Sequence, residues 1–330
     1  MNDSSDTPRW VVNIIHTCMG LQNGEKVLIV VDEPLSHARD TLIAEAIKTE
    51  PAELWSYTFP NASRPFNEYP ATLLTLLSQV DVIVLLLASM DIAKELPAWN
   101  AAKVVALAGP ARAGWGAFID QSILDYEMSA DYEQIAEFSL SLAEQVRGSS
   151  IAHLTTPLGT DLRMSLADRE WKVDTGKLRG RGVYGNLPAG EIYIAPNEDS
   201  AEGVLVIDKS FPGLLLSDPV KLFFEKGRVT HIEGGEGKRY LENAFAQHGD
   251  TARVIAELGI GTNPMARLQG NIMTDEKVLG TIHIAVGRND FIGGKNIATT
   301  HIDGVISQPT LKIDGKLLIT NGKHTRLAAG

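Results

Sequence analysis

The feature that most constrains the fold is a series of uninterrupted apolar segments in the first half of the chain, separated by segments of helical composition. The apolar segments have the composition of strands and cover residues 26–31, 52–59, 80–87 and 103–107. Helical composition covers residues 36–49 and 71–79. Strands that are apolar on both faces are typical of a parallel sheet covered by helices. The sequence therefore predicts an open α/β domain with doubly wound character over residues 1–147.

The second half of the chain has a different pattern. Residues 131–147 form one amphipathic helical segment that ends at Gly148, and we place the domain boundary there. Beyond it, short alternating segments are separated by many glycines, which is typical of an antiparallel-rich α+β domain. Helices are expected only over residues 238–246 and 251–257. We therefore predict an α/β chain whose second domain, residues 148–330, is antiparallel-rich α+β and binds metal.

Composition narrows the range of functions. The 330 residues carry a net charge of −11, which argues against nucleic-acid binding because that function needs a basic face. Cys18 is the single cysteine, so an internal disulfide and a thiolate metal cluster are excluded. The acidic start of the chain and the lack of a long apolar run predict a cytoplasmic protein without a membrane segment. No glycine-rich turn follows the first strand, which argues against a dinucleotide site.

Several ionisable side chains share strand faces in the second domain. In residues 300–306, His301 and Asp303 project from one face because side chains two positions apart point the same way. His283 projects opposite to its aliphatic neighbours, and so does Glu191. Glu257 is expected at a helix end before a glycine-rich turn, where a carboxylate is poorly placed for the helix dipole.

Each of these residues taken alone is more often structural than catalytic. Together, two histidines and three carboxylates suit two divalent ions, whose charge the carboxylates and a bridging hydroxide would balance. A set of this kind is what a two-metal hydrolytic site requires.

Five ordered motifs in the second domain resemble the aminopeptidase T/aminopeptidase S family of co-catalytic metallopeptidases. They are LTTPLGTDL at 154–162, GNLPAGE at 185–191, ELGIGTN at 257–263, GTIHIAVG at 280–287 and HIDG at 301–304. The resemblance implies that Glu191 and His283 hold one metal, that His301 and Asp303 hold the second, and that Glu257 lies between them. It also implies a homodimer in which the N-terminal domain helps to close the partner's active site.

One position departs from the family pattern. The family places a tyrosine seven residues after the motif histidine, where this chain has Asp290. A phenol can donate a hydrogen bond to a developing oxyanion, whereas an ionised carboxylate cannot. Asp290 is then an additional metal ligand, or another donor such as Tyr193 takes the role, or the reaction is not peptide hydrolysis. Arg288 could bind a substrate carboxylate, although a solvated turn arginine is the simpler interpretation.

A second resemblance, carried by PNEDSAEG at 196–203, is to the dihydroxypyridine ring-opening dioxygenases. It implies a single Fe(II) held by two histidines and one carboxylate. Those enzymes share the pair His301 and Asp303 and have a histidine where this chain has Glu257.

The main prediction is therefore a metal-dependent aminopeptidase or related amide hydrolase with two Zn, Co or Mn ions. Its substrate would be a small peptide or amide. The alternatives are an Fe(II) dioxygenase acting on aromatic or heteroaromatic diols, and a non-catalytic member of the family.

Overall fold

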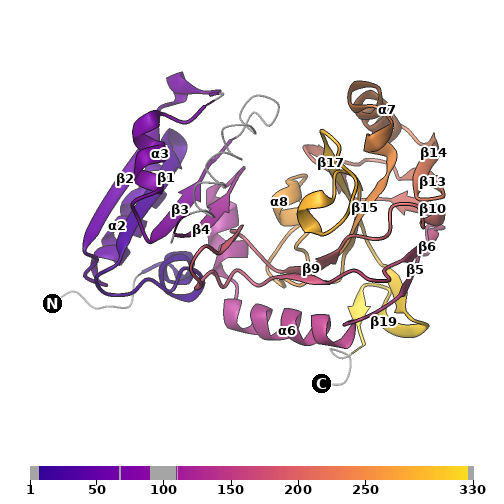
Figure 1. Ribbon diagram of the computed structural model, residues 1–330, viewed down its shortest axis with the longest axis horizontal. Coiled ribbons are helices and arrows are strands. Elements are labelled where there is room, and N and C mark those ends of the chain that lie inside the picture. The colour runs from indigo at the N-terminus through magenta and orange to yellow at the C-terminus, as the bar shows by residue number, and fades with distance from the viewer. Residues whose placement is uncertain (1–6, 67, 90–108, 110, 326–330) are drawn as a thin grey trace. The chain divides into compact units, whose positions relative to one another are not determined.

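A computed structural model of the chain describes residues 7–66, 68–89, 109 and 111–325 (Figure 1). It divides into two compact units. The first comprises the chain up to Ala136 together with Asp174–Ala189, and the second comprises Glu137–Val173 and the chain from Gly190 onward. The sequence analysis placed one boundary after residue 147. In the structure the division falls inside helix α6 (Tyr132–Gln145), and Asp174–Ala189 returns to the first unit.

The first unit contains a parallel sheet with the strand order β2-β1-β3-β4-β8. Its strands are β1 (Lys26–Asp32), β2 (Glu53–Phe59), β3 (Val82–Leu86), β4 (Arg112–Gly116) and β8 (Tyr184–Asn186). Successive residues of β1 pack into two different apolar clusters, one on each face of the sheet. This two-sided burial explains the uninterrupted apolar segments, and it confirms the predicted parallel α/β unit. The strand predicted at 103–107 lies outside the described residues.

The second unit contains two largely antiparallel sheets. Sheet B has the order β14-β13-β10-β6-β5-β18-β19-β20. Its strands are β5 (Ile151–Thr155), β6 (Asp161–Ser165), β10 (Glu202–Ile207), β13 (Val220–Glu225), β14 (Arg228–Glu233), β18 (Thr310–Ile313), β19 (Lys316–Thr320) and β20 (Lys323–His324). Sheet C has the order β12-β11-β17-β16-β15-β9-β7. Its strands are β7 (Lys172–Asp174), β9 (Glu191–Ile194), β11 (Ser210–Phe211), β12 (Leu214–Leu215), β15 (Ile255–Gly261), β16 (Ile282–Gly287) and β17 (His301–Ile306). The predicted antiparallel-rich α+β architecture is confirmed.

Helices are short in both units. The first unit has α1 (Arg9–Val12), α2 (Ser36–Ile47), α3 (Ala71–Leu77) and α5 (Gln121–Asp125). The second has most of α6, together with α7 (Glu236–His248) and α8 (Ile272–Asp275). Among the described residues, no helix combines the length and the apolar character needed to cross a membrane.

The helix expected at 251–257 is wrong. A 3-10 turn covers Asp250–Arg253, and the chain then enters strand β15. All seven residues of β15 are buried, and the strand is hydrogen-bonded to β16 on one side and to β9 on the other. Pairing on both edges outweighs the local pattern, because a central strand satisfies its backbone groups through its neighbours. Glu257 is therefore a residue in the interior of a strand and does not end a helix.

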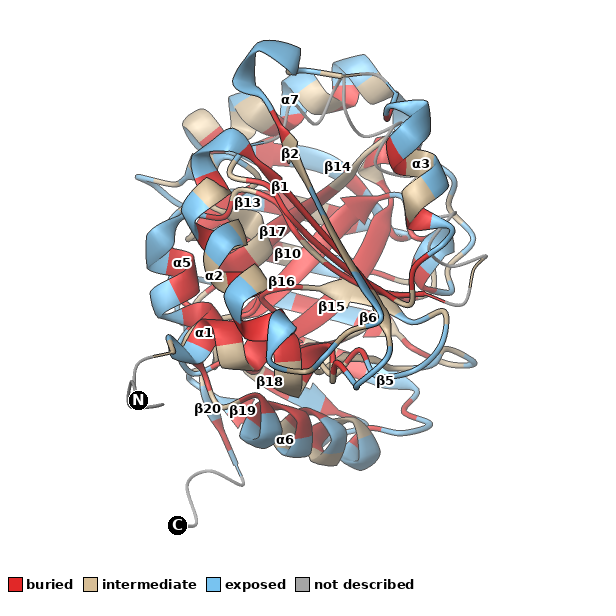
Figure 2. Ribbon diagram, turned by 90° about the vertical axis from the view of Figure 1, so that its left-hand side faces the viewer, coloured by how far each residue is buried: buried red, intermediate tan, exposed pale blue. Residues whose placement is uncertain are grey.

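Sheet C has one polar face and one apolar face along β9, β15, β16 and β17. The aliphatic side chains of these strands pack into the core of the second unit. They are Ile192, Ile194, Leu258, Ile260, Ile282, Ile284, Val286, Ile302 and Ile306. Figure 2 shows β15, β16 and β17 as buried strands. The alternation that supplies the core on one face therefore places the remaining side chains together on the other.

The core of this unit also contains a histidine without a polar partner. His324 is 2% exposed, its ring lies edge-on to Phe138 with centroids 5.0 Å apart, and neither ring nitrogen has a hydrogen-bond partner among the described residues. Burial lowers the pKa of His324 to about 4. In the unfolded chain the pKa is about 6.5, so protonation favours unfolding and stability falls as the pH drops from 6.5 towards 4.

We predict that His324→Phe removes this fall in the free energy of unfolding at low pH. Between pH 7.5 and 4.5 the wild type should lose about 2–3 kcal/mol more unfolding free energy than the variant, as measured by urea titration at both pH values. His231→Phe, at an exposed position of β14, is the matched control and should behave like the wild type. An unchanged pH dependence in His324→Phe would contradict the prediction.

Candidate metal centre

The predicted metal ligands lie on one face of four neighbouring strands. Glu191 comes from β9, Glu257 from β15, His283 from β16, and His301 and Asp303 from β17. The strand register aligns Glu257 with Ala285 and Ala285 with Asp303, so the two acidic residues flank one small residue. The structure thus brings together five residues that are spread over 113 positions of the sequence, from Glu191 to Asp303.

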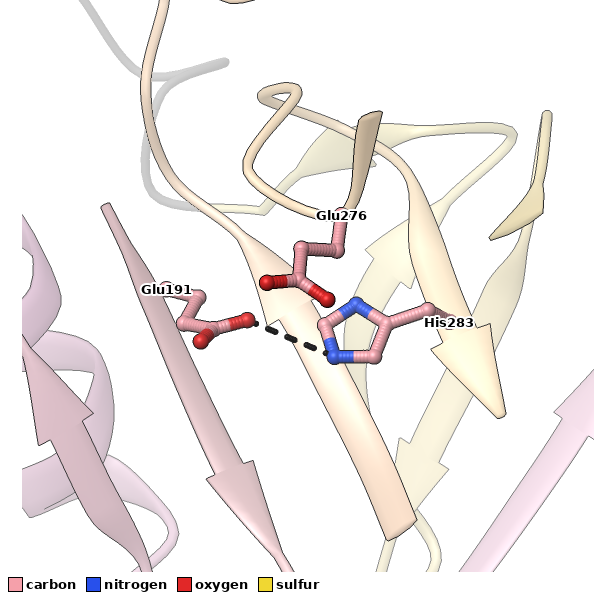
Figure 3. A group of neighbouring side chains, drawn as sticks. All are labelled: Glu191, Glu276 and His283. Atoms are coloured by element: carbon pink, nitrogen blue, oxygen red, sulfur yellow. Dashed lines mark ion pairs between the residues drawn. The ribbon is translucent and has the colours of Figure 1, made fainter. Parts of the chain in front are cut away.

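The first group of possible ligands consists of Glu191, Glu276 and His283, whose ligand atoms all lie within 4.8 Å of one another. His283 Nε2 lies 3.3 Å from Glu191 Oε2, and the other ring nitrogen turns toward the Glu276 carboxylate (Figure 3). His283 is fully buried and the two glutamates are nearly so. The imidazole thus presents Nε2 to the space between Glu191 and Glu257, while Nδ1 forms no hydrogen bond within the described residues.

The second group consists of Glu257, His301 and Asp303. His301 Nε2 lies 3.3 Å from Asp303 Oδ2 and 3.4 Å from Glu257 Oε2. The short distance to Asp303 confirms that this pair shares a strand face. His301 Nδ1 lies 2.6 Å from the backbone oxygen of Arg288, which accepts a hydrogen bond from that nitrogen and leaves Nε2 free to bind an ion.

Glu257 belongs to both halves of the centre. Its Oε1 lies 3.2 Å from His283 Nε2, and its Oε2 lies 3.4 Å from His301 Nε2. Two donors that bind one ion at bond lengths of roughly 2.0–2.2 Å are themselves separated by about 3.0–3.5 Å. Each oxygen of Glu257 therefore has the spacing expected for a shared ion with a different histidine, which is the geometry of a bridging carboxylate.

Unpartnered buried atoms provide an independent test of whether a cation fits. Among the described residues, Glu191 Oε2, Asp303 Oδ1 and His283 Nδ1 are buried without a hydrogen-bond partner. Burying a charged oxygen without a partner is costly, and divalent ions are one of the few groups that relieve the cost. The donor set contains only imidazole nitrogens and carboxylate oxygens, which suits Zn, Co, Mn or Fe. These residues fit divalent metal ions.

Small residues make room for the ligands. Gly259 aligns with His283 on the neighbouring strand, and a Cβ atom built on Gly259 would lie 1.8 Å from His283 Nε2. Any larger side chain at this position would occupy the space of the imidazole ring. This close approach explains the glycine that follows Glu257 by two positions in the ELGIG motif.

Neighbouring charges shift the pKa values of the candidate ligands. Burial alone would lower the pKa of His283, but Glu257 and Glu191 outweigh it and raise the pKa to about 9. Burial likewise opposes the charged form of His301, yet Asp303 and Glu257 raise its pKa well above the usual range. Burial raises the pKa of Glu191 to about 8, whereas hydrogen bonds from the two histidines outweigh burial and lower the pKa of Glu257 to about 2. In the metal-free protein, protons therefore occupy atoms that an ion would use.

Sequence analysis missed two members of the cluster. Glu276 follows the short helix α8, and the adjacent Lys277 is fully buried between Glu276 and Glu191. Neither residue lies in a strand, so the alternation that identified the other side chains does not extend to them. A Glu-Lys pair beside a helix is ordinarily a solvated surface feature, and only the tertiary structure reveals its burial.

The three other predicted site residues lie beside the two clusters. Tyr193 shares the polar face of β9 with Glu191 and aligns with Gly259. Asp290 forms a two-point ion pair with Arg288, at 2.5 and 3.0 Å, and belongs to neither group of possible ligands. Asp290 therefore forms an ion pair with Arg288 and is not placed as an additional metal ligand.

Comparison with known proteins identifies the family. The family model described as NicX: 2,5-dihydroxypyridine 5,6-dioxygenase matches residues 124–326. The chain belongs to this family. The match includes every residue of both clusters.

Curated relatives carry two kinds of enzyme name. The chain is 27% identical over 184 residues to a 2,5-dihydroxypyridine 5,6-dioxygenase from Pseudomonas putida, covering 52% of this chain and 53% of the relative. It is 24% identical to aminopeptidase AmpS from Bacillus subtilis and 26% identical to aminopeptidase T from Thermus thermophilus. These two matches cover 50% and 51% of this chain and 45% of each relative. The matched regions thus span about half of the length of the curated relatives, and those relatives are enzymes.

Solved structures with both names share the fold. The 2,5-dihydroxypyridine dioxygenase from Pseudomonas putida superposes with a TM-score of 0.77 at 17% identity, covering 98% of each chain. Wild-type AmpT from Thermus thermophilus superposes with a TM-score of 0.74 at 16% identity, covering 96% of this chain and 98% of AmpT. The two superpositions establish the fold. They do not distinguish between the two enzyme activities, so the metal-ligand set must be used for that.

We predict that Gly259→Ala displaces His283 and weakens metal binding while the fold persists. The added methyl would overlap the imidazole, so the ring must leave its position between Glu191 and Glu257. Metal content by mass spectrometry should fall by about one ion per chain, and the circular dichroism spectrum should be unchanged. Gly235→Ala is the control, because a Cβ built there meets no atom within 4 Å and its φ of −86° is accessible to alanine. Full metal content in Gly259→Ala would contradict this geometry.

Metal binding should also release protons. Because both imidazoles and the Glu191 carboxyl group hold protons at pH 7, incoming ions must displace about three protons per chain. Affinity should therefore fall as the pH is lowered, by about tenfold per pH unit for each displaced proton. Calorimetric titrations in buffers of different ionisation enthalpy measure this release directly. Binding heats that do not depend on the buffer would show that the imidazoles are already neutral.

Proposed function

We propose that the protein is a two-metal hydrolase that removes the N-terminal residue from small peptides or cleaves related amides. The observation that carries this proposal is the placement of Glu257, whose two oxygens face two different histidines at 3.2 and 3.4 Å. A bridging carboxylate of this kind is useful where two ions act together on one substrate.

Each half of the centre would then have a defined set of protein ligands. Glu191 and His283 would hold one ion, His301 and Asp303 the other, and Glu257 would bridge them. Four carboxylates and the Lys277 ammonium carry a net charge of −3 when the imidazoles are neutral, so two divalent ions and one hydroxide bring the centre to neutrality. The ions would supply Lewis acidity and a water of lowered pKa.

The protein side chains would manage the proton and the developing charge. A proton must pass to the leaving amine, and Glu276 is our candidate to carry it, since burial raises its pKa above the usual range, whereas both oxygens of Glu257 would be bound to ions. Tyr193, on the same strand face as Glu191, is our candidate for the hydrogen-bond donor to the oxyanion. Asp290 is a poor donor, because the Arg288 hydrogen bond lowers its pKa and keeps it ionised.

Arg288 and its neighbours would form the substrate side of the centre. The Arg288 backbone oxygen orients His301, and its guanidinium is paired with Asp290. Phe291 is 53% exposed, and its ring lies edge-on to His301 with centroids 5.3 Å apart. Release of Arg288 from Asp290 would allow it to bind a substrate carboxylate, while Phe291 would contact an apolar substrate group.

A ring-opening dioxygenase is the second candidate, and the family match and the Pseudomonas relative favour it. Such an enzyme would use one Fe(II) bound by two histidines and a single carboxylate. Here the two histidines are each beside two carboxylates, and one of these carboxylates is shared. This surplus of carboxylate suits two ions better than one, so we favour hydrolysis. We extend the proposal to a cytoplasmic homodimer that binds neither nucleic acid nor membranes.

The direct test compares both reactions on one preparation. Protein loaded with Zn, Co or Mn should hydrolyse dipeptides with a free amino terminus, and N-acetylation of the same dipeptides should reduce the rate strongly. Protein loaded with Fe(II) under anaerobic conditions should then consume no oxygen when oxygen and a dihydroxypyridine are added. Oxygen uptake together with loss of the pyridine absorbance, without any amide hydrolysis, would replace this proposal with the dioxygenase.

We predict that Glu257→Gln lowers hydrolysis by at least a thousandfold while the protein remains folded. The amide removes the negative charge shared by the two positions and replaces one acceptor oxygen with a donor. Rates on a dipeptide, with the melting temperature as a fold check, provide the measurement. Glu225→Gln on the exposed surface of β13 is the matched control. Activity within a few-fold of the wild type in Glu257→Gln would refute the assignment.

A further inference from the structure

Lys277 is an unusual component of a metal centre because it is a cation placed among the ligands. Its side chain has 0% exposure, and its Nζ lies 2.5 Å from Glu191 Oε1 and 2.7 Å from Glu276 Oε1. Both contacts are charge-assisted hydrogen bonds of normal length. The ammonium group therefore binds the two carboxylates that surround His283.

The backbone holds this lysine in place. The Lys277 amide donates to Thr274 O at 3.0 Å, and the Lys277 carbonyl accepts from the Asn263 amide at 2.9 Å. A Cβ built on Gly261 would lie 2.7 Å from the Lys277 carbonyl carbon, so the segment packs directly against strand β15. The Lys277 backbone is thus fixed against the sheet, and the Glu191 and Glu276 carboxylates hold the ammonium group at the end of its side chain.

The Lys277 ammonium contacts one oxygen of Glu191 and one oxygen of Glu276, and the second oxygen of each carboxylate remains available. Glu191 gives Oε1 to Lys277, and its Oε2 faces His283 at 3.3 Å without a hydrogen bond. Lys277 thereby aims the remaining oxygen at the first ion position. It also adds a positive charge beside that position, which opposes a second positive charge in a buried, weakly screened site.

The second position has no such neighbour. Within the described part of the chain, neither Glu257 nor Asp303 forms an ion pair with a lysine or an arginine. The protein ligands of an ion held there would be Glu257, Asp303 and His301. The two halves of the centre therefore have similar ligands, but among the described residues only the first half holds an ammonium group, which occupies one oxygen of Glu191 and one of Glu276.

We propose that Lys277 makes the two ion positions unequal, so that the His301/Asp303 position binds its ion tightly and the Glu191/His283 position binds a weaker, exchangeable ion. This inference rests on the proposed two-metal centre. It makes Lys277 a positioning residue that also sets the order of loading: the second position fills first, and the first position fills only at higher metal concentration.

The test is a titration of metal-free protein with Zn²⁺ alone, followed by calorimetry and by mass-spectrometric counting of ions per chain. The wild type should show two phases whose dissociation constants differ by at least tenfold. Glu191→Gln should abolish the weak phase and retain the tight one, whereas Asp303→Asn should impair the tight phase. These two variants assign each phase to its half of the centre.

Lys277→Met should tighten the weak phase by at least tenfold, because it removes the opposing charge. Lys312→Met, an exposed lysine on strand β18 of sheet B, is the matched control and should leave both phases unchanged. The metal-free Lys277→Met protein is expected to melt at a lower temperature, since two buried carboxylates lose their partner. Its zinc-loaded form should therefore gain more melting temperature on loading than the wild type does.

Two further measurements keep the outcome clear if Lys277→Met does not fold without metal. Lys277→Gln keeps hydrogen-bond donors without the charge, and chelator competition on zinc-loaded protein needs no metal-free fold. Equal phases in the wild type, a weak phase that maps to Asp303, or an unchanged or weakened weak phase in both Lys277 variants would overturn the inference. Failure of the wild type to bind any zinc would instead overturn the proposed two-metal function.

Discussion

The constraint on which this structure depends is the gathering of four carboxylates at one face of a sheet, three from its strands and one from the segment after helix α8. Glu191 and Glu276 lie together with His283 and Lys277, and Glu257 and Asp303 lie together with His301. Buried like charges are costly unless cations compensate them. In the metal-free protein this compensation comes from Lys277 and from protons on the imidazoles. Divalent ions would replace those protons, which is why metal binding and protonation are linked in this molecule.

Apolar packing on the opposite face of the sheet offsets this electrostatic cost. Strands β9, β15, β16 and β17 bury their aliphatic side chains in the main core of the second unit. Their backbones are paired with neighbouring strands, so the ligands project from a rigid sheet whose geometry is set before any ion binds. Gly259 occupies a position where a larger side chain would displace His283. Such preorganisation is what a catalytic metal site requires.

Most of the correct predictions about the strands and the candidate ligands came from the alternation of apolar and polar residues. The alternation around His283 and His301 placed both histidines on the polar face, and the HxD spacing placed Asp303 beside His301. Continuous apolar segments likewise indicated the parallel sheet, because each strand of that sheet is buried on both sides. These features are local, so the sequence expresses them within a few residues.

Features that depend on tertiary contacts were not predictable in the same way. The segment that contains Glu257 has apolar positions compatible with a helix, and its true state is decided by the two strands that flank it. Glu276 and Lys277 lie outside any periodic element, and the return of Asp174–Ala189 to the first unit leaves no local signal. The bridging position of Glu257 followed from resemblance to a family, and its two histidine contacts are visible only in three dimensions.

Relatives with two different enzyme names share one fold, so the chemistry of this chain must follow from the donor set at its centre. In this chain the decisive residue is Glu257, which offers one oxygen to each half. The most direct measurement is the anomalous scattering of zinc in crystals of the loaded protein. The account predicts two peaks about 3.5–4 Å apart that flank the Glu257 carboxylate, one beside His283 and one beside His301. A single peak, or two peaks that Glu257 does not connect, would contradict it.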